Sequence, residues 1–221
     1  MLGAMWTLAK PKMPGPGEAL PGRAEKMPVP EKHFVSGARL QPPFPAGMQL
    51  ATFGLGCFWG AEKKFWQQAG VYSTAVGYAG GTTPNPTYRE VCSGLTGHTE
   101  VVQVVFDPKV VSYNTLLDLY WHRTDPRQAD GQFCDHGASY HPAIFWRNES
   151  QRAAAEASKA QVEKQLGKPV VTYIRKAGPF WRAEEYHQDF YKKNPVRYQL
   201  YRSGCGRDAR LKQLWGERAG H

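Results

Sequence analysis

The sequence predicts an α+β fold, a two-layer sandwich in which helices pack on a mixed β-sheet. Apolar segments with the period of a strand are interleaved with amphipathic segments of helical spacing. This pattern occupies residues 48–195, about the length of one domain. The composition, with 41% hydrophobic and 21% charged residues, is typical of a globular protein and excludes collagen, coiled coil and wholesale disorder.

Proline separates an N-terminal arm from this domain. Nine of the 17 prolines lie in residues 1–50. Because proline lacks a backbone N–H and has a fixed φ, such a segment cannot form a regular helix or a central strand. We therefore expect residues 1–47 to be an extended arm, either disordered or draped over the domain.

The first half of the domain alternates between strands and a helix. Residues 49–55 are an apolar run that breaks at glycines, so we expect a short strand there. The large side chains of residues 57–66 recur at helical spacing and predict a helix. A second strand over residues 71–78 ends at a glycine pair, and turn-forming residues fill the loop over residues 82–97. Valines dominate residues 100–107 and predict a third strand.

The second half contains longer helices. Leucines at helical spacing predict an amphipathic helix over residues 113–122. An alanine-rich helix is expected over residues 150–166, with Ser150 as its N-cap and Gly167 at its end. The remaining expected elements are strands over residues 141–146 and 169–175 and a helix over residues 183–193.

Positive charge is concentrated outside the domain. The chain has 28 basic and 19 acidic side chains, a net charge of +9, whereas residues 51–190 are neutral overall. A nucleic-acid-binding protein places its charge on the folded face that meets phosphate, so we expect no specific nucleic-acid partner. Residues 196–221, which show no strong helix or strand pattern, are expected to be a basic C-terminal tail.

Neither a membrane span nor a secretory signal is expected. No stretch approaches the ~18 consecutive apolar residues that a membrane helix needs. The apolar opening residues are followed, not preceded, by their first positive charge, Lys10, whereas a signal peptide has positive charge before its apolar core. We therefore expect a cytoplasmic protein, and we expect it to be a monomer.

The four cysteines do not suggest a metal site. The chain contains Cys57, Cys92, Cys134 and Cys205 but no Cys-x-x-Cys pair, and no histidine stands at zinc-finger spacing from a cysteine pair. The chain is also large enough to form a core without structural disulfides. The cysteines are therefore either inert buried thiols or reactive ones.

Cys57 has the position of a reactive thiol. It lies where a strand gives way to a helix, after Gly56 permits a tight turn. The N–H groups at a helix N-terminus stabilise a thiolate, so we expect the pKa of Cys57 to lie below ~8.5. Phe58 and Trp59 follow directly, and we expect at least one of these rings to line an opening beside the sulfur.

The sequence around Cys57 resembles that of the peptide methionine sulfoxide reductase A family. Residues 56–60, Gly-Cys-Phe-Trp-Gly, are identical to the signature of this family. The resemblance continues in the same order through residues 77–81, 85–94, 96–100 and 135–137. It implies the fold of that family, a catalytic domain over residues 48–195, and reduction of the S epimer of methionine sulfoxide, free or within oxidised proteins.

The resemblance also implies roles for individual side chains. A sulfoxide loses its oxygen only if that oxygen is protonated, so the site needs a thiolate, an acid and hydrogen bonds to the oxygen. Cys57 matches the nucleophile of the family, and Glu100 matches the acid, whose pKa we expect apolar surroundings to raise. Tyr88 and Tyr140 match the tyrosines that hold the oxygen. Asp135 matches an aspartate that places water or substrate.

Phe58 and Trp59 resemble the pocket that receives the methyl group of the substrate, a role suited to apolar rings. Loss of oxygen leaves Cys57 as a sulfenic acid, which must condense with a second thiol. Relatives commonly carry this resolving cysteine in a glycine-containing C-terminal segment, which matches Cys205. The resemblance thus implies a two-cysteine cycle, in which thioredoxin reduces a Cys57–Cys205 disulfide without a metal, flavin or nucleotide.

The other two cysteines are expected to have no part in this cycle. Cys134 is an alternative resolving thiol, but we expect a half-buried bystander. Cys92 is expected to be buried and inert.

Two other classes of function stay open at this point. A cysteine hydrolase would pair Cys57 with His136 or His187 and would act on esters or amides without consuming a reductant. A non-enzymatic module that senses redox state or binds polyanions would show no turnover and a salt-sensitive association.

Overall fold

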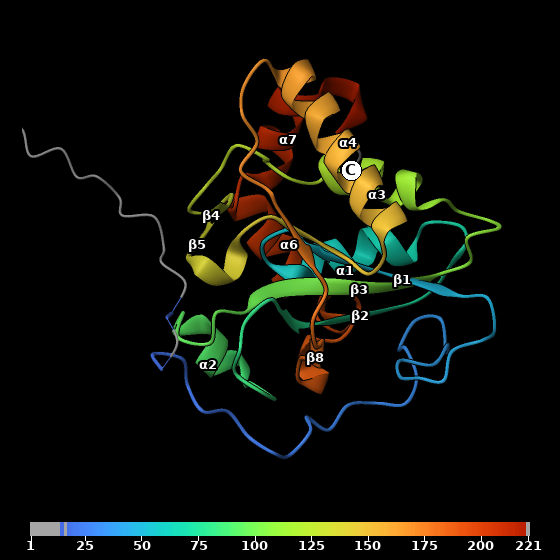
Figure 1. The fold of residues 1–221 in the computed structure, drawn as a ribbon, viewed down its shortest axis with the longest axis vertical. Helices are drawn as coiled ribbons and strands as arrows, with labels where there is room; N and C mark the ends of the chain where they lie inside the picture. Colours follow the sequence, from blue (N-terminus) through green and yellow to red (C-terminus); the bar gives the residue numbers. More distant parts are fainter. Residues whose placement is uncertain (1–13, 16, 220–221) are drawn as a thin grey trace, which may run out of the picture.

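The computed structural model describes residues 14–15 and 17–219, which form a six-stranded sheet covered by helices (Figure 1). The strands of this sheet are β1 (Gln49–Gly54), β2 (Val71–Ala79), β3 (Thr99–Phe106), β6 (Ala143–Trp146), β7 (Tyr173–Lys176) and β8 (Trp181–Arg182). A separate hairpin consists of β4 (Gly131–Gln132) and β5 (Asp135–His136). The α-helices are α1 (Phe58–Trp66), α2 (Tyr88–Cys92), α3 (Tyr113–Trp121), α4 (Glu149–Leu166), α5 (Phe190–Lys193), α6 (Pro195–Gly204) and α7 (Arg207–Trp215).

The sheet is mixed, and the predicted α+β fold class is confirmed. Its strand order is β7-β6-β1-β3-β2-β8, with the β6–β7 pair parallel and the other pairs antiparallel. This order places β3 between β1 and β2, which pair with its two edges, and core clusters cover its two faces, so that every residue of β3 is buried. A side chain at the start of β3 therefore lies in the interior of the domain.

The main core lies between the sheet and helices α1, α3 and α4. The ring of Phe53 on β1 stacks on Phe65 of α1 and on Tyr120 of α3, with ring centroids 5.1 and 5.5 Å apart. The opposite face of the sheet carries a smaller cluster around Val101 and Phe145. Because the core anchors α1 through Phe65, the start of this helix has a fixed position relative to β3.

Helix α4 confirms one predicted boundary and corrects the other. Gly167 ends the helix in the left-handed region, with a φ of 61°, as the sequence predicts. The N-cap is Asn148 instead of Ser150, because the side chain of Asn148 accepts a hydrogen bond from the N–H of Gln151 at 2.9 Å. Both residue types favour this position, so the local sequence does not decide between them.

Residues 183–193 do not form the single helix that the sequence predicts. They contain one 3-10 turn, η2 (Glu185–His187), and the four-residue helix α5. Between them, Asp189 has a φ of 54°, which is incompatible with a continuous helix. The side chain of Gln188 bonds to the backbone N–H and C=O of Val76 at 3.0 and 2.9 Å and holds this segment against β2.

The described part of the N-terminal arm is draped over the domain, one of the two states expected. This part of the arm contains no helix. Its only regular backbone pairing is an isolated β-bridge between Lys32 and Arg39. Its anchor is His33, whose buried ring lies 2.9 Å from the hydroxyl of Thr74 on β2 and 3.2 Å from a carboxylate oxygen of Asp189. The N–H groups of Val35 and Ser36 both donate to its Nδ1 at 3.2 Å.

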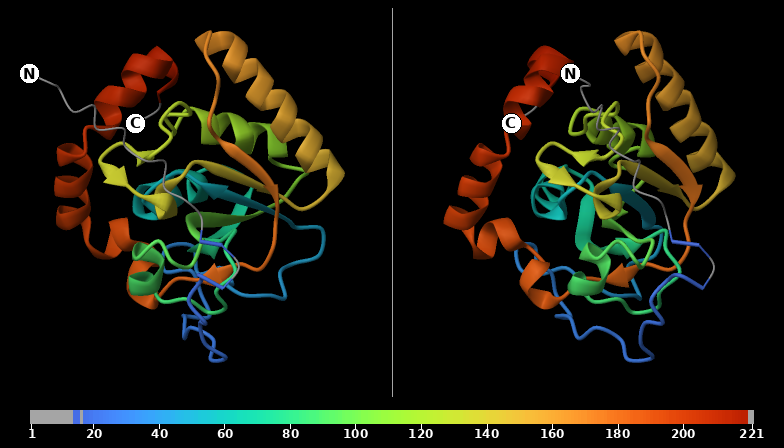
Figure 2. Two further views of the ribbon diagram at one scale, coloured as in Figure 1. Left: turned by 60° about the vertical axis from the view of Figure 1, so that its left-hand side comes forward. Right: turned by 90° about the vertical axis from the view of Figure 1, so that its left-hand side faces the viewer.

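The C-terminal residues form two helices, so the expectation of a tail without regular structure is wrong. Helix α6 begins with Pro195 in its first turn, and α7 buries Leu211 and Trp215 against the domain. Gly206, with a φ of 67°, makes the break between the two helices. Figure 2 shows both helices (red) along one side of the domain.

No helix in the described part of the chain combines the length and the apolar character needed to cross a lipid bilayer.

Candidate active site

Cys57 is the N-cap of α1, at the position that the sequence predicts. Gly56 before it has a φ of 77°, and a Cβ there would lie 2.5 Å from the Cβ of Gln132 in the β4–β5 hairpin. Glycine is therefore needed at this position for two reasons: it adopts the positive φ of the turn, and it leaves room for the hairpin to approach. The thiol is free but only 7% exposed.

The thiol of Cys57 does not have the lowered pKa that we expected. Burial is the largest influence and raises the pKa above the ordinary value, and the negative charges of Glu100 and Asp135 raise it further. The nearby N–H of Trp59 and the nearby hydroxyl of Tyr201 act in the opposite direction and lower the pKa. The increase in the pKa of Cys57 caused by burial thus exceeds the decrease caused by the helix N-terminus. The thiol is therefore protonated before substrate binds.

Glu100 lies at the start of β3 and has the raised pKa that the sequence predicts. Its side chain accepts a hydrogen bond from the N–H of Phe58 at 3.1 Å, which places the carboxyl group beside the residue that follows the nucleophile. Burial raises the pKa of Glu100 to about 8, and the Phe58 N–H and the charge of Arg207 act against this increase. The carboxyl group therefore carries a proton at neutral pH and can donate it.

Tyr88 and Tyr140 lie close to each other near Glu100. Tyr88 is the first residue of α2, and its N–H donates to Glu184 at 2.8 Å. Tyr140 ends the 3-10 turn η1 (Ala138–Tyr140). The two hydroxyls lie close enough to influence one another, and burial, followed by the charge of Glu100, raises the pKa of both tyrosines. Both hydroxyls are therefore un-ionised donors.

Asp135 is linked to the nucleophile by a residue that the sequence analysis missed. The hydroxyl of Tyr201 on α6 donates to Asp135 and also interacts with the thiol of Cys57. The sequence predicts an irregular tail over residues 196–221, so it does not place Tyr201 in the site. The signal was present, since Tyr198 and Tyr201 have the i, i+3 spacing of one helix face.

The two rings beside Cys57 have different surroundings. Phe58 is 1% exposed and packs on Tyr78 and His187 in the core. Trp59 is partly exposed, stacks on Phe190 with centroids 3.7 Å apart, and meets the edge of Tyr201. The structure thus places Trp59 at the surface beside the nucleophile and Phe58 beneath it.

A buried cation lies on the other side of the cluster. Arg207, the first residue of α7, is 4% exposed, and its guanidinium stands over the ring of Phe133 at 4.3 Å. Its charge lowers the pKa of Glu100 and of Asp135 against the larger effect of burial. Like Tyr201, it belongs to the segment that the sequence analysis treated as a tail.

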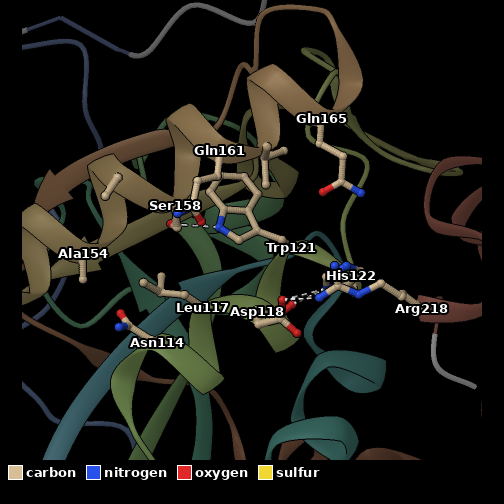
Figure 3. A pocket seen from close by; sticks show the side chains of 12 residues that line it. Asn114, Leu117, Asp118, Trp121, His122, Ala154, Ser158, Gln161, Gln165 and Arg218 are labelled. Atoms are coloured by element: carbon tan, nitrogen blue, oxygen red, sulfur yellow. Dashed lines mark hydrogen bonds and ion pairs between the residues drawn. The ribbon is translucent and has the colours of Figure 1, made fainter.

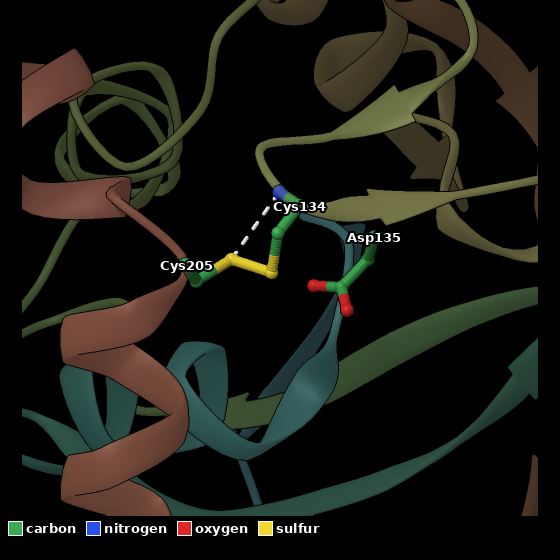
Figure 4. A group of neighbouring side chains, drawn as sticks. All are labelled: Cys134, Asp135 and Cys205. Atoms are coloured by element: carbon green, nitrogen blue, oxygen red, sulfur yellow. Dashed lines mark hydrogen bonds between the residues drawn. A yellow bond between two sulfur atoms is a disulfide. The ribbon is translucent and has the colours of Figure 1, made fainter.

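A disulfide joins Cys134 and Cys205 (Figure 4). Their Cα atoms are 5.0 Å apart although 71 positions separate them in the sequence. Cys205 is therefore bonded to Cys134 and not, as the sequence implied, to Cys57. The expectation that Cys134 is a bystander is also wrong, because the turn between β4 and β5 brings it to the end of α6, a proximity that no local pattern reveals.

The remaining thiol and the histidines stand apart from Cys57. Cys92 is exposed, not buried as expected. His136 is exposed and pairs with Asp130 at 2.8 Å. The Nδ1 of His187 accepts the indole N–H of Trp59 at 2.9 Å, and burial lowers its pKa to about 4. Neither histidine is hydrogen-bonded to Cys57, which the hydrolase hypothesis requires.

Two groups of side chains have the composition of metal ligands, and neither fits an ion well. In the first, two of the three donors, Cys134 and Cys205, are bonded to each other. In the second, His33 faces Glu62 and Asp189. Because the Nδ1 of His33 accepts two backbone N–H bonds, its Nε2 carries the proton and has no lone pair for a metal.

A cavity of about 390 Å³ lies between α3 and α4 (Figure 3). Its polar lining includes Asp118, His122 and Arg218, and Arg218 pairs with Asp118 at 2.8 Å. None of its lining residues belongs to the cluster around Cys57, so this cavity is not the site of the predicted chemistry.

Comparisons with known proteins agree with this geometry. A family model described as "Peptide methionine sulfoxide reductase" matches residues 49–219. The chain is 60% identical over 190 residues to a peptide methionine sulfoxide reductase MsrA of Azotobacter vinelandii, covering 84% of this chain and 88% of that protein. It is 54% identical over 193 residues to MsrA 1 of Synechocystis sp., covering 86% and 87%.

Solved structures are similar as well. Methionine sulfoxide reductase A of Corynebacterium diphtheriae superimposes with a TM-score of 0.76 at 36% identity, covering 84% of this chain and 92% of that one. Mxr1 from Saccharomyces cerevisiae in its reduced form gives a TM-score of 0.65 at 32% identity, covering 69% and 88%.

Proposed function

This chain belongs to the peptide methionine sulfoxide reductase family, and from this premise we propose that it reduces the S epimer of methionine sulfoxide, free or within oxidised proteins, at Cys57. One observation carries the proposal for these residues. A protonated carboxyl group, that of Glu100, is hydrogen-bonded to the N–H of Phe58, the residue that follows the buried thiol. A proton donor and a nucleophile so close together suit a reaction that removes an oxygen atom from sulfur.

The sulfoxide oxygen binds in this scheme among Glu100, Tyr88 and Tyr140, which are all donors at neutral pH. Glu100 transfers its proton to the oxygen while the sulfur of Cys57 attacks the sulfoxide sulfur. The Cys57 thiol gives its proton to the Glu100 carboxylate as the bond between its sulfur and the substrate sulfur forms, and Glu100 then protonates the substrate hydroxyl, which leaves as water. A water molecule attacks the sulfur of Cys57 and returns a proton to Glu100. The sulfur–sulfur bond breaks with its two electrons on the substrate, so that the products are the thioether and the sulfenic acid of Cys57.

Asp135 and Tyr201 serve the thiol in this proposal. The hydroxyl of Tyr201 lies near Cys57 and donates its single proton to Asp135; by turning that proton from Asp135 to Cys57 it can stabilise the thiolate as it forms. Trp59, which is partly exposed above the buried Phe58, supplies the apolar wall for the methyl group of the substrate. The S epimer is favoured because oxygen and methyl group then have separate places to bind.

Regeneration requires only thiols. Cys205 condenses with the sulfenic acid of Cys57 and releases water, and thioredoxin supplies the electrons that end the cycle. No metal, flavin or nucleotide is needed because every electron passes through sulfur. We also propose that the protein is a monomer and that it is cytoplasmic, since thioredoxin stays reduced in that compartment.

The proposal is tested by single-turnover reduction of the two sulfoxide diastereomers of a blocked methionine. We expect the wild-type protein to consume only the S diastereomer, and we expect Cys57→Ser to consume neither, because a serine hydroxyl is un-ionised and a weak nucleophile toward sulfur. Turnover of an ester substrate without consumption of reductant would support the hydrolase instead. Turnover of the sulfoxide by Cys57→Ser would contradict the assignment of the nucleophile.

A further inference from the structure

We propose that the N-terminal arm positions the ring of Trp59 by holding Asp189 against the domain. This inference rests on the proposed function, in which Trp59 forms the apolar wall for the methyl group of the substrate. His33 and Asp189 are then positioning residues, which act through other side chains on the selection of a methyl sulfoxide over sulfoxides with a larger alkyl group.

One short segment, residues 187–190, holds the ring of Trp59 at its face and at its edge. The face stacks on Phe190, with ring centroids 3.7 Å apart and an angle of 11° between the planes. The indole N–H donates to the Nδ1 of His187 at 2.9 Å. Gln188 and Asp189 separate these two partners in the sequence, so the backbone between them sets both contacts at once.

Asp189 turns the chain within this segment. Its φ of 54° and ψ of 31° lie in the left-handed region, which an L-residue occupies only when its surroundings hold it there. Its carbonyl accepts the N–H groups of Lys192 and Lys193 at 2.9 and 3.1 Å and so begins helix α5. If Asp189 relaxed to an ordinary conformation, the chain would leave in another direction and Phe190 would no longer face Trp59.

The arm supplies two polar partners of the Asp189 side chain. One carboxylate oxygen accepts the N–H of Phe34 at 3.0 Å, and the other lies 3.2 Å from the Nε2 of His33, which carries a proton. The backbone N–H of Asp189 donates to Glu62 of helix α1 at 2.7 Å. The side chains of His33 and Asp189 are fully buried, so water does not replace a partner that is lost. The arm therefore fixes the side chain of Asp189, while α1 fixes its backbone.

Apolar contacts join the arm to the same part of the domain. Val35 packs against the buried cluster that contains Phe190, and Trp59 packs against this cluster as well. The Nζ of Lys193 lies 5.3 Å from the ring centroid of Phe34. The arm thus contacts the surroundings of Trp59 through three consecutive residues, 33–35.

A separate contact of the arm with the domain provides a control. The guanidinium of Arg23 donates to the carbonyl of Asn85 at 3.1 and 2.9 Å, and the amide of Asn85 donates to the carbonyl of Arg23 at 2.8 Å. This contact involves none of the residues that hold Trp59. Arg23→Ala therefore loosens the arm without removing a partner of Asp189.

His33→Ala should weaken the selection of substrate and leave the chemical step unchanged. We expect KM for the S diastereomer of methionine sulfoxide to rise about three- to tenfold, while the single-turnover rate at saturating substrate stays within about twofold of wild type. The ratio of kcat/KM for methionine sulfoxide to that for ethionine sulfoxide should fall about fivefold or more, because a movable wall admits the extra carbon. Asp189→Gly, which keeps the left-handed backbone but loses the carboxylate that the arm holds, should have the same effect.

Two further variants separate this role from a general loss of structure. Arg23→Ala should keep the KM and the alkyl preference of wild type. His33→Gln, whose amide N–H can face Asp189 in place of the imidazole N–H, should restore most of the preference. A loss of preference in Arg23→Ala as large as that in His33→Ala would overturn the proposal.

A double-mutant cycle tests whether the arm acts through the stacked ring. Phe190→Leu removes that ring and should lower the alkyl preference by itself. When it is combined with His33→Ala, we expect little further loss, because the two changes remove successive members of one chain of contacts. Effects that multiply in the double variant would show that His33 does not act through Phe190, which contradicts the proposal.

Hydrogen–deuterium exchange tests the contact between the arm and residues 187–190 without any substrate. The N–H groups of Lys192 and Lys193 are bonded to the carbonyl of Asp189. We expect them to exchange about tenfold or more faster in His33→Ala and in Asp189→Gly than in wild type or in Arg23→Ala. Equal exchange in all four proteins would overturn the proposal.

The outcomes distinguish this inference from the proposed function. If the wild type reduces the sulfoxide but His33→Ala and Asp189→Gly keep its KM and alkyl preference, the arm does not position Trp59 and the reductase activity stands. If the wild type reduces no sulfoxide, the proposed function fails, and the exchange rates alone decide whether the arm holds the segment around Asp189.

Discussion

At the scale of single residues, the proposed proton donor, Glu100, and the proposed nucleophile, Cys57, are two different buried side chains. Burial raises the pKa of the Cys57 thiol and of the Glu100 carboxyl group, so both groups are protonated before substrate binds. A buried thiol that stays protonated reacts slowly with small oxidants and with other disulfides, because the thiolate is the reactive form. In the proposed reaction, transfer of the Glu100 proton to the substrate coincides with activation of the thiol, so reactivity is confined to the bound sulfoxide.

Glu100→Gln tests this division of roles. The amide keeps the size of the side chain but cannot supply a proton, and we expect the single-turnover rate of sulfoxide reduction to fall by about 10²–10⁴. In the wild type this rate should decrease as the pH rises through about 8, because the acid form of Glu100 is lost there. The decrease should be missing in the variant. A pH series by rapid quench measures both, and a loss below threefold would remove Glu100 from the role of donor.

At the scale of elements, helices α6 and α7 complete the site. Tyr201 of α6 and Arg207 of α7 reach Cys57 and Glu100 from the segment between residues 195 and 215, and Cys205 lies between the two helices. The angle between the helices therefore sets the position of Cys205 relative to Cys134. That angle depends on Gly206 and its left-handed backbone conformation.

Gly206→Ala and Gly204→Ala form a matched pair for this turn. A Cβ at either position meets no atom within 4 Å, but only Gly206 has a positive φ, of 67°. Because an L-residue pays about 1–2 kcal/mol in the left-handed region, Gly206→Ala should lower the free energy of unfolding by roughly that amount. Gly204→Ala lies in α6 and should be neutral or slightly stabilising. Urea denaturation measures both, and equal effects would show that the backbone conformation of Gly206 is not the reason.

At the scale of the whole molecule, the N-terminal arm is fastened to the catalytic domain by one buried histidine. The ring of His33 reaches β2 through Thr74 and the segment before α5 through Asp189. The N–H of Phe34 also donates to Asp189 at 3.0 Å. The arm thus joins two segments of the domain that are far apart in the sequence, and Asp189 precedes the helix whose Phe190 supports Trp59.

His33→Ala should loosen the arm and destabilise the domain. Removal of the ring takes one buried partner from the hydroxyl of Thr74 and one from the carboxylate of Asp189, which costs about 1–3 kcal/mol. Lys32→Ala, at the exposed neighbouring position, is the control and should change the free energy of unfolding by less than about 0.5 kcal/mol. Urea denaturation and the rate of proteolysis within the arm are the measurements. Equal stability of the two variants would mean that the arm is not anchored through His33.

The sequence by itself determined the fold class of this protein, through the alternation of strands and helices. It also predicts the nucleophile and the acid. The prediction of Cys57 comes from the glycine turn before it and from the family signature, whereas that of Glu100 comes from the resemblance to the family. The raised pKa of Glu100 was predictable because the valine-rich strand that contains it is buried.

Only the tertiary structure decided the pKa of Cys57, the contributions of Tyr201 and Arg207, and the partner of Cys205. The pKa of Cys57 depends on how completely Glu100, Asp135 and Tyr201 enclose the thiol, which is a sum over three distant segments. The bond from Cys205 to Cys134 joins residues 71 positions apart through a short hairpin and a helix end. Such proximity is set by the packing of elements on the sheet, and the spacing of cysteines along the chain carries no record of it.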